Sequence, residues 1–176
     1  MGNMPKSRLK TAGFIVGLSA LLVGGGWIAA SQANVPASGN AEIAAMHFQP
    51  YAPQKVVYHV NESGGLFDRS YKNLLQIARN HVDAVGKDWL DLRIVLQGDG
   101  AGLLMSARKN SELARHIDEL KRDGVKIVIC RSTLTLRRID PDTKMYDLAR
   151  SDIVHSGVGE ATALVQQGYV YLKPIH

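Results

Sequence analysis

The sequence predicts an α/β domain with a largely parallel sheet of about five strands, flanked by helices in a three-layer arrangement. The main observation is that short β-branched runs and amphipathic stretches alternate repeatedly between residues 55 and 172. A second is that residues 125–130 (VKIVIC) are apolar on both faces apart from one lysine, as expected for a covered central strand. A third is composition, because 45% apolar residues and a single cysteine exclude a disordered chain and a disulfide framework.

The first half of the domain contains two predicted strands separated by a helix. Residues 55–61 (KVVYHVN) are short and β-branched, which indicates a strand. Residues 69–85 carry apolar side chains at helical spacing on one face and mostly polar or charged ones on the other, which predicts an amphipathic helix. Residues 91–97 (DLRIVLQ) predict the second strand.

The second half continues the same alternation. Asn110 and Ser111 are typical N-caps for a helix that runs through Leu120, and Gly124 stands where a left-handed residue would end it. The strand at 125–130 follows. After it we expect, in order, a short helix at 133–138, a turn at 140–143, a strand at 152–155, a helix through Val158 and Val165 that stops at Gly168, and a last strand at 169–172.

The first 33 residues have the pattern of a secretory signal peptide. Lys6, Arg8 and Lys10 form a basic flank, residues 12–30 are apolar, and small residues precede a cleavage site after Ala33. The apolar segment spans about 28 Å, close to the roughly 30 Å hydrocarbon core, so an uncleaved membrane anchor is the alternative. Either way we expect an exported domain, periplasmic or anchored to the inner membrane and facing the periplasm.

Residues 34–54 are rich in Ala and Pro and predict a linker before a domain at residues 55–176. The formal net charge of +5 comes largely from the N-terminus. Removing residues 1–33 takes away 3 basic and no acidic residues from 21 and 16, which leaves 18 against 16 and a net charge of +2. The charge therefore gives no support for nucleic-acid binding, and we expect membrane contact only through the N-terminal segment.

Ligands of an open parallel sheet bind beyond the carboxyl ends of its strands, where helix N-termini present free N–H groups. The single cysteine, Cys130, lies at such an end. Arg131 and the predicted helix start near Ser132 or Thr133 favour thiolate over thiol, and the thiolate is the nucleophile. The alternative is that Cys130 is a small buried residue that completes a core strand. Because the chain has no second thiol, a self-contained dithiol oxidoreductase is excluded, whereas a persulfide carrier or a mixed-disulfide partner is chemically possible.

Two further groups lie at the same predicted edge. Gly98, Asp99 and Gly100 lack the Lys-Ser/Thr pair of a phosphate-binding loop, so we interpret them as a tight turn, with a nucleotide-binding loop as the alternative. His155 ends a strand beside the crevice and is a candidate acid or base, whereas His59 lies inside a strand and is interpreted as a core residue with satisfied hydrogen bonds. The histidines show no metal-ligand clustering, and we expect neither a metal nor a cofactor.

An ordered set of short motifs resembles the DsrE/DsrF-like family of sulfur-metabolism proteins over residues 55–174. The set comprises residues 95–100 (VLQGDG), 120–130 (LKRDGVKIVIC), 132–134 (STL), 156–158 (SGV) and 167–174 (QGYVYLKP). The resemblance implies a compact α/β fold that assembles as homo-oligomers, typically trimers or hexamers. It also implies a cysteine that accepts and passes on sulfane sulfur as a persulfide, which falls on Cys130. Gln97 stands where related sequences often have His, and Ser132 where they often have Asn; most relatives are cytoplasmic.

These observations together predict an exported, homo-oligomeric sulfur-handling protein, a sulfurtransferase or a sulfur carrier, with Cys130 as the catalytic residue. We expect it to exchange sulfur with donor and acceptor proteins or small thiols, and not to bind nucleic acid. The alternative is a non-catalytic oligomeric module of the same fold that binds a small anion or a protein. The residues expected to bind substrate or stabilise anionic sulfur are Gly98, Asp99, Gly100, Arg131, Ser132 and His155.

Overall fold

The computed structural model describes residues 43 and 45–175 of the chain. The chain divides into two units, residues 1–46 and 47–176, and the fold reported below is that of the second unit. The predicted signal peptide or anchor at residues 1–33 lies outside the described residues, as do residues 34–42 and 44 of the predicted linker at 34–54. None of the helices in the described part is both long and apolar enough to cross a membrane.

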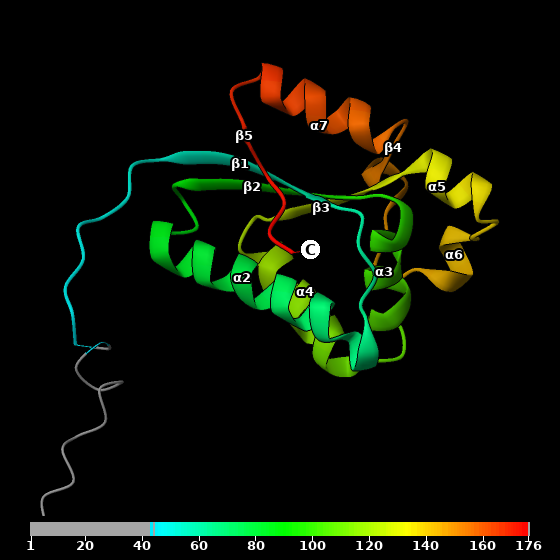
Figure 1. The fold of residues 1–176 in the computed structure, drawn as a ribbon, viewed down its shortest axis with the longest axis horizontal. Helices are drawn as coiled ribbons and strands as arrows, with labels where there is room; N and C mark the ends of the chain where they lie inside the picture. The colour runs from blue at the N-terminus through cyan, green and yellow to red at the C-terminus, as the bar shows by residue number, and fades with distance from the viewer. Residues whose placement is uncertain (1–42, 44, 176) are drawn as a thin grey trace, which may run out of the picture. The chain divides into compact units, whose positions relative to one another are not determined.

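Five parallel strands form the sheet in the order β4-β3-β2-β1-β5, which confirms the predicted fold class. Strands β1 to β4 are added in one direction, and the chain then returns to place β5 on the other side of β1. All carboxyl ends therefore meet at one edge, on the right in Figure 1. The strands are β1 (Gln54–Val60), β2 (Leu90–Leu96), β3 (Lys126–Cys130), β4 (Ile153–Val154) and β5 (Val170–Leu172).

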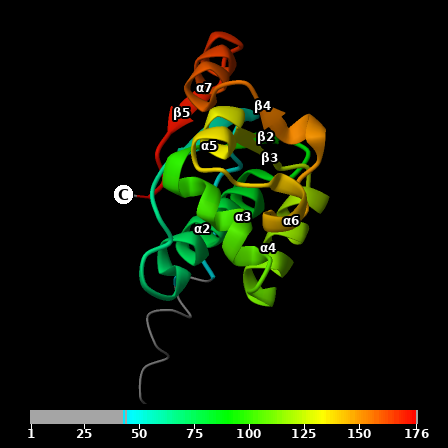
Figure 2. The same cartoon turned by 90° about the vertical axis from the view of Figure 1, so that its right-hand side faces the viewer.

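The helices are distributed unequally over the two faces of the sheet (Figures 1 and 2). Helices α2 (Arg69–Val85), α3 (Gly102–Ala107) and α4 (Ser111–Arg122) cover one face. Helix α7 (Gly157–Gln166) lies on the other. Two short helices, α5 (Arg131–Leu136) and α6 (Pro141–Lys144), lie towards the carboxyl edge, and three 3-10 turns complete the unit: η1 (Leu66–Asp68), η2 (Gly98–Ala101) and η3 (Arg150–Asp152).

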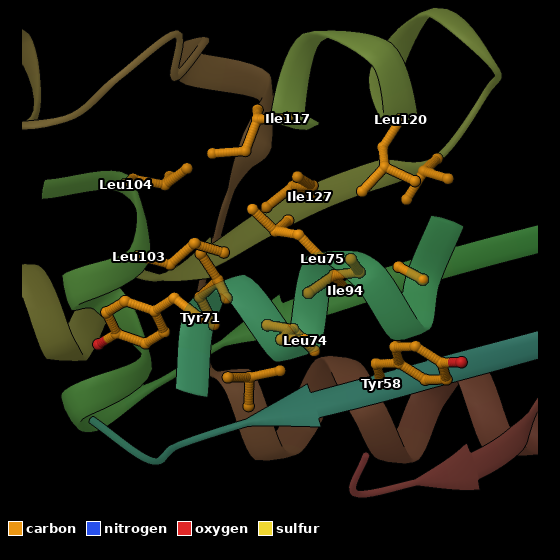
Figure 3. Packing of buried hydrophobic residues seen from close by; sticks show 14 of the residues in the cluster. Tyr58, Tyr71, Leu74, Leu75, Ile94, Leu103, Leu104, Ile117, Leu120 and Ile127 are labelled. Carbon is orange, nitrogen blue, oxygen red and sulfur yellow. The ribbon is translucent and has the colours of Figure 1, made fainter. Parts of the chain in front are cut away.

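The deep core is the cluster of buried side chains between the sheet and helices α2, α3 and α4 (Figure 3). Leu74 and Leu75 of α2 are fully buried there, together with Ile94 from the middle of β2. They meet because the helix repeats its apolar side chains every three to four residues while the strands present alternate residues to this face. Full burial of each such side chain contributes about 1.5–3 kcal/mol, so this face supplies most of the hydrophobic stabilisation.

The α7 face is much thinner. Its buried residues are Val57 and Val95 from the strands, Ala161 and Leu164 from α7, and Tyr169 before β5. Several strand residues of this face are polar or charged and are not fully buried, such as the half-buried Arg93 and the exposed Lys126. One short helix thus separates this face of the sheet from solvent.

The element boundaries largely follow the sequence pattern, with differences at the carboxyl edge. Asn110 caps α4 by accepting hydrogen bonds from the N–H groups of Glu112 and Leu113, and Gly124 has the predicted left-handed backbone with φ 95°. The residues after the glycine-rich turn form α3, which sequence periodicity does not reveal because glycines interrupt it. The turn predicted at residues 140–143 is instead the single helical turn α6 at Pro141–Lys144, with Asp140 as its N-cap and a proline in its first turn.

Candidate functional site

Cys130 is the last residue of β3 and the N-cap of α5, so its sulfur lies where a buried strand ends and a helix begins. Ile129 packs in the deep core, and strand side chains alternate, so Cys130 faces the α7 side. The chain re-enters this place at Gly157, the first residue of α7: a Cβ at that position would lie 3.3 Å from the Cβ of Cys130. Two helix N-termini therefore converge on one sulfur, and Cys130 is only 3% exposed.

Polar hydrogens rather than a charged side chain surround the sulfur. Burial acts to raise the pKa of the Cys130 thiol, but the N–H groups of Gly157 and Thr133, the Thr133 hydroxyl and the N–H of Ser132 together lower that pKa below its ordinary value. No standard N-cap hydrogen bond to the sulfur is formed in the described structure. Such contacts tighten when an acceptor becomes charged, so the arrangement favours a thiolate or another sulfur-centred anion over the neutral thiol.

Thr133 connects Cys130 to the glycine-rich turn. Its side chain is almost fully buried, and its Oγ1 accepts a 3.0 Å hydrogen bond from the N–H of Gly98. The hydroxyl acts here as an acceptor, so its own hydrogen remains available to donate towards the sulfur. The sequence pattern marked Thr133 as a possible helix start but not as a site residue; the signal for a site residue was a hydroxyl three positions after a strand-ending cysteine.

The glycine-rich turn is a tightly packed structural element. Gly98 has a left-handed backbone with φ 54°, and a Cβ on Gly100 would lie 2.1 Å from the carbonyl oxygen of Val60, so only glycine fits there. The carboxylate of Asp99 forms a 2.6 Å ion pair with Arg137, and its carbonyl accepts a 2.6 Å hydrogen bond from Tyr71. The turn therefore holds Gly98 against Thr133, and the charge of Asp99 is paired with that of Arg137.

Gln97 lies between Cys130 and a histidine of the neighbouring strand. A Cβ at Gly157 would come within 2.7 Å of the Gln97 Oε1. The same Oε1 is 3.1 Å from Nε2 of His59, and Nδ1 of His59 is 2.9 Å from the hydroxyl of Tyr171. These contacts confirm that both ring nitrogens of His59 are hydrogen-bonded. Gln97 thus separates the His59 imidazole from the sulfur, and it occupies the position where related sequences often have histidine.

The side chains of the remaining candidate residues, Ser132, His155 and Arg131, have other partners or surroundings than the sulfur. The Ser132 hydroxyl donates to the backbone carbonyl of His155 over 3.4 Å, which ties α5 to the end of β4. The imidazole of His155 is exposed and forms no hydrogen bond or ion pair with the described residues. Arg131 is exposed as well, and its side chain lines a separate hollow described below. The carboxyl edge therefore brings Cys130, Ser132 and Gly98 together, whereas Asp99, Arg131 and His155 have other surroundings.

No group of three or more His, Cys, Asp or Glu side chains is arranged to hold a metal ion within the part of the chain that the structure describes. The site's polar groups are instead backbone N–H groups, one hydroxyl and one amide, which stabilise an anion without a bound cation.

The fold and this edge define a class of protein. It is a parallel α/β domain with helices on both faces of the sheet, and it carries one thiol, whose anionic form is favoured, at the carboxyl end of a central strand. The model of the DsrE/DsrF-like family matches residues 54–174, more than half of the chain. The chain belongs to the DsrE/DsrF-like family, and this membership indicates a function related to sulfur metabolism.

One solved structure supports the same assignment. It is described as the structure of protein of unknown function MTH1491 from Methanobacterium thermoautotrophicum. The chain is 26% identical to it with a TM-score of 0.56, over 69% of this chain and 99% of that one. No curated protein matches the chain.

Proposed function

We propose that this protein is an exported sulfur carrier or sulfurtransferase in which Cys130 holds sulfane sulfur as a persulfide. The observation that carries the proposal is that the N-termini of α5 and α7 meet at the only cysteine of a DsrE/DsrF-like chain, because Cys130 is the N-cap of α5 and Gly157 begins α7 beside it. A persulfide is more acidic than a thiol and is anionic at neutral pH, so the same helix N-termini suit both the loaded and the unloaded forms.

The transfer needs no oxidant. The Cys130 thiolate attacks the terminal sulfur of a donor persulfide, a new sulfur–sulfur bond forms, and the donor's own sulfur–sulfur bond breaks with its electron pair leaving on the donor thiolate. One proton accompanies the terminal sulfur or is released to solvent. Delivery to an acceptor thiolate is the same exchange in reverse, with Cys130 as the leaving thiolate.

Access to the sulfur requires a local opening, because Cys130 is 3% exposed. The chain segment beside Cys130, which is β4 and the turn after it, is suited to such an opening. Strand β4 is only two residues long and pairs with β3 alone, and the turn that follows leads directly into Gly157. Short edge elements with few pairing hydrogen bonds open at a small free-energy cost compared with global unfolding.

Intact-mass measurement after incubation with polysulfide tests the proposal. We expect the protein to gain the mass of one sulfur atom, to lose it on addition of dithiothreitol, and to gain none as Cys130→Ser. Absence of the adduct in the wild-type protein with several persulfide and polysulfide donors would refute the carrier function. Serine is the matched control because it replaces sulfur by oxygen and leaves the rest of the side chain.

We propose export on the strength of the N-terminal pattern, with its basic flank before the apolar residues 12–30. A fusion of residues 1–54 to alkaline phosphatase should be active in the periplasm, and replacing Lys6, Arg8 and Lys10 by Glu should lower that activity. An inactive fusion would contradict export. N-terminal sequencing of the exported protein distinguishes cleavage after Ala33 from a retained anchor.

We also propose that the domain forms homo-oligomers. Apolar side chains are exposed on neighbouring parts of α7 and β5, and they line a hollow of about 250 Å3 beside His59. Light scattering on the purified protein should give a mass above that of one chain, and Val165→Glu should lower it. A monomer at all concentrations would contradict this assembly. The exposed apolar residues that line this hollow are Val158, Val165 and Tyr171.

The burial of Cys130 favours a second candidate, a non-catalytic module in which the cysteine only completes the sheet. The two functions differ in the folded protein's reaction with small thiol reagents. A carrier reacts with iodoacetamide at a rate that reflects local opening, far above the rate of global unfolding. A module reacts only as fast as the whole domain unfolds.

A further inference from the structure

We propose that a hollow beside α5 and α6 binds an organic anion, that is, a ligand with an apolar body and a carboxylate or sulfonate group. The hollow measures about 410 Å3 and is a surface depression of the domain. Three arginines from separate segments line it: Arg131 at the start of α5, Arg138 just after its end, and Arg150 in η3. This proposal does not depend on persulfide chemistry, and it concerns a different place in the fold from the sulfur of Cys130.

The floor of the hollow is apolar. Leu134 is buried, and Ile139 and Ile153 are half-buried and pack against the deep core. Ile153 pairs in register with Ile129, whose side chain lies in the deep core, so the hollow opens on the side of β4 opposite to Cys130. A ligand that covers this floor therefore removes hydrocarbon surface from water without touching the sulfur.

The charges around the hollow are not balanced. The acidic residue in its lining is Asp140, whose carboxylate is already used as the N-cap of α6: it accepts hydrogen bonds from the Asp142 N–H and the Thr143 hydroxyl. Arg150 forms an ion pair with Asp142. Arg131 and Arg138 form no ion pair or side-chain hydrogen bond with any of the described residues. Two guanidinium groups are thus left unpaired at the rim of an apolar depression.

The backbone at Arg138 provides an independent observation. Arg138 has φ 52°, and the N–H of Ile139 returns to the carbonyl of Leu134 over 2.9 Å, so Arg138 occupies the left-handed position that ends a helix. Glycine adopts this conformation freely, whereas a residue with a Cβ pays about 1 kcal/mol or more. The arginine side chain at this position is therefore not explained by the stability of the turn, and it is one of the side chains that line the hollow.

The shape and charge select the ligand class. A guanidinium group offers two parallel N–H donors that match the paired oxygens of a carboxylate or sulfonate. A bare inorganic anion would leave the apolar floor exposed, and an uncharged apolar molecule would leave the two arginines without partners. An anion with an apolar body satisfies both parts.

Calorimetric titration of the full chain with 4-methylbenzenesulfonate tests the site. We expect saturable binding that weakens with added sodium chloride, and affinities at least about fivefold lower for inorganic sulfate and for uncharged 4-methylbenzenesulfonamide. Equal affinity for sulfate and the sulfonate would show a plain electrostatic surface. Equal affinity for the sulfonamide would show apolar binding without arginine recognition. Either result, or no binding, overturns the proposal.

Variants at Arg138 separate binding from folding. Arg138→Gly should lower sulfonate affinity at least about fivefold while the thermal unfolding midpoint stays the same or rises, because glycine relieves the left-handed backbone. Arg138→Lys should keep more of the affinity than Arg138→Gly does. Arg131→Gln should also lower the affinity, because Arg131 lines the same hollow. Arg122→Ala, an exposed arginine at the end of α4, is the matched control and should change nothing. Unchanged affinity in Arg138→Gly and Arg131→Gln would refute the site.

Discussion

The two faces of the sheet differ in thickness and in content. The deep core under α2, α3 and α4 is continuous and apolar, with Leu75 and Ile94 fully buried. The α7 face has a small core around Leu164, and next to it lie Cys130, Gln97 and the other groups that act on the sulfur. The fold thus places its stability on one face and its chemical groups on the other.

This difference has a physical reason. A buried site that must accept a reactant has to open. The free energy of opening is small only where the opening exposes little apolar surface. A polar environment for an anion also needs N–H groups without partners, which helix N-termini provide and strand interiors do not. The thin face offers both conditions at the start of α7.

The largest effect should follow from damage to the deep core. Leu75→Ala removes a fully buried side chain and should lower the free energy of unfolding by about 2–5 kcal/mol. The rate at which iodoacetamide modifies Cys130 in the folded protein should stay within the experimental error, since the α7 face is untouched. Urea unfolding and alkylation kinetics measure the two quantities. A faster alkylation in native buffer would mean that the two faces are not separable.

A smaller stability loss with a larger chemical effect is expected on the α7 face. Leu164→Ala should cost about 1–3 kcal/mol, because fewer neighbours surround this 5% exposed residue. Loosening α7 should speed the alkylation of Cys130. If alkylation keeps its wild-type rate, α7 does not control access to the sulfur.

Thr133 should affect both stability and pKa. Thr133→Val removes the acceptor of the Gly98 N–H and the hydroxyl that acts on the sulfur, so we expect a loss of about 1–2 kcal/mol and a raised pKa of the Cys130 thiol. Thr133→Ser keeps the hydroxyl and is the matched control. The pH dependence of alkylation provides the measurement. A pKa that is the same in the valine and serine variants would exclude the hydroxyl from the site.

The smallest effect concerns the amino end of the α7 face. Burial acts to raise the pKa of Asp91, but hydrogen bonds from Arg93 and Tyr169 lower that pKa overall. The ionised carboxylate is therefore favoured in the folded state, and its contribution is present above the unfolded pKa of about 4 and is lost as pH falls through the folded value. Asp91 is partly exposed, so the contribution should stay below about 1 kcal/mol.

Denaturant unfolding at neutral and acidic pH measures this contribution. The stability difference between the wild type and Asp91→Asn should shrink as the pH falls from 7 to about 3. A difference that is constant over this range would show that the carboxylate's charge does not stabilise the fold.

The sequence was sufficient to predict the parallel sheet because the spacing of apolar residues is a local signal. Residues 125–130 predicted a covered central strand, and Asn110 and Gly124 predicted the two ends of α4. Helix α3 was missed because glycines masked its start. The position of Cys130 at a strand end was also readable. The sequence alone did not reveal that Gly157 lies beside the sulfur, or that Gly98 holds the Thr133 hydroxyl in place, because these contacts arise from packing between segments far apart along the chain.

Titration of the Cys130 thiolate tests the central claim most directly. Thiolate absorbance in the ultraviolet, measured for the folded protein against Cys130→Ser, should give a midpoint below the ordinary thiol pKa of about 8.5 and should return towards that value in urea. A folded-state midpoint at or above the urea value would mean that the convergent N–H groups do not stabilise the anion, and the proposed sulfur transfer would lose its physical basis.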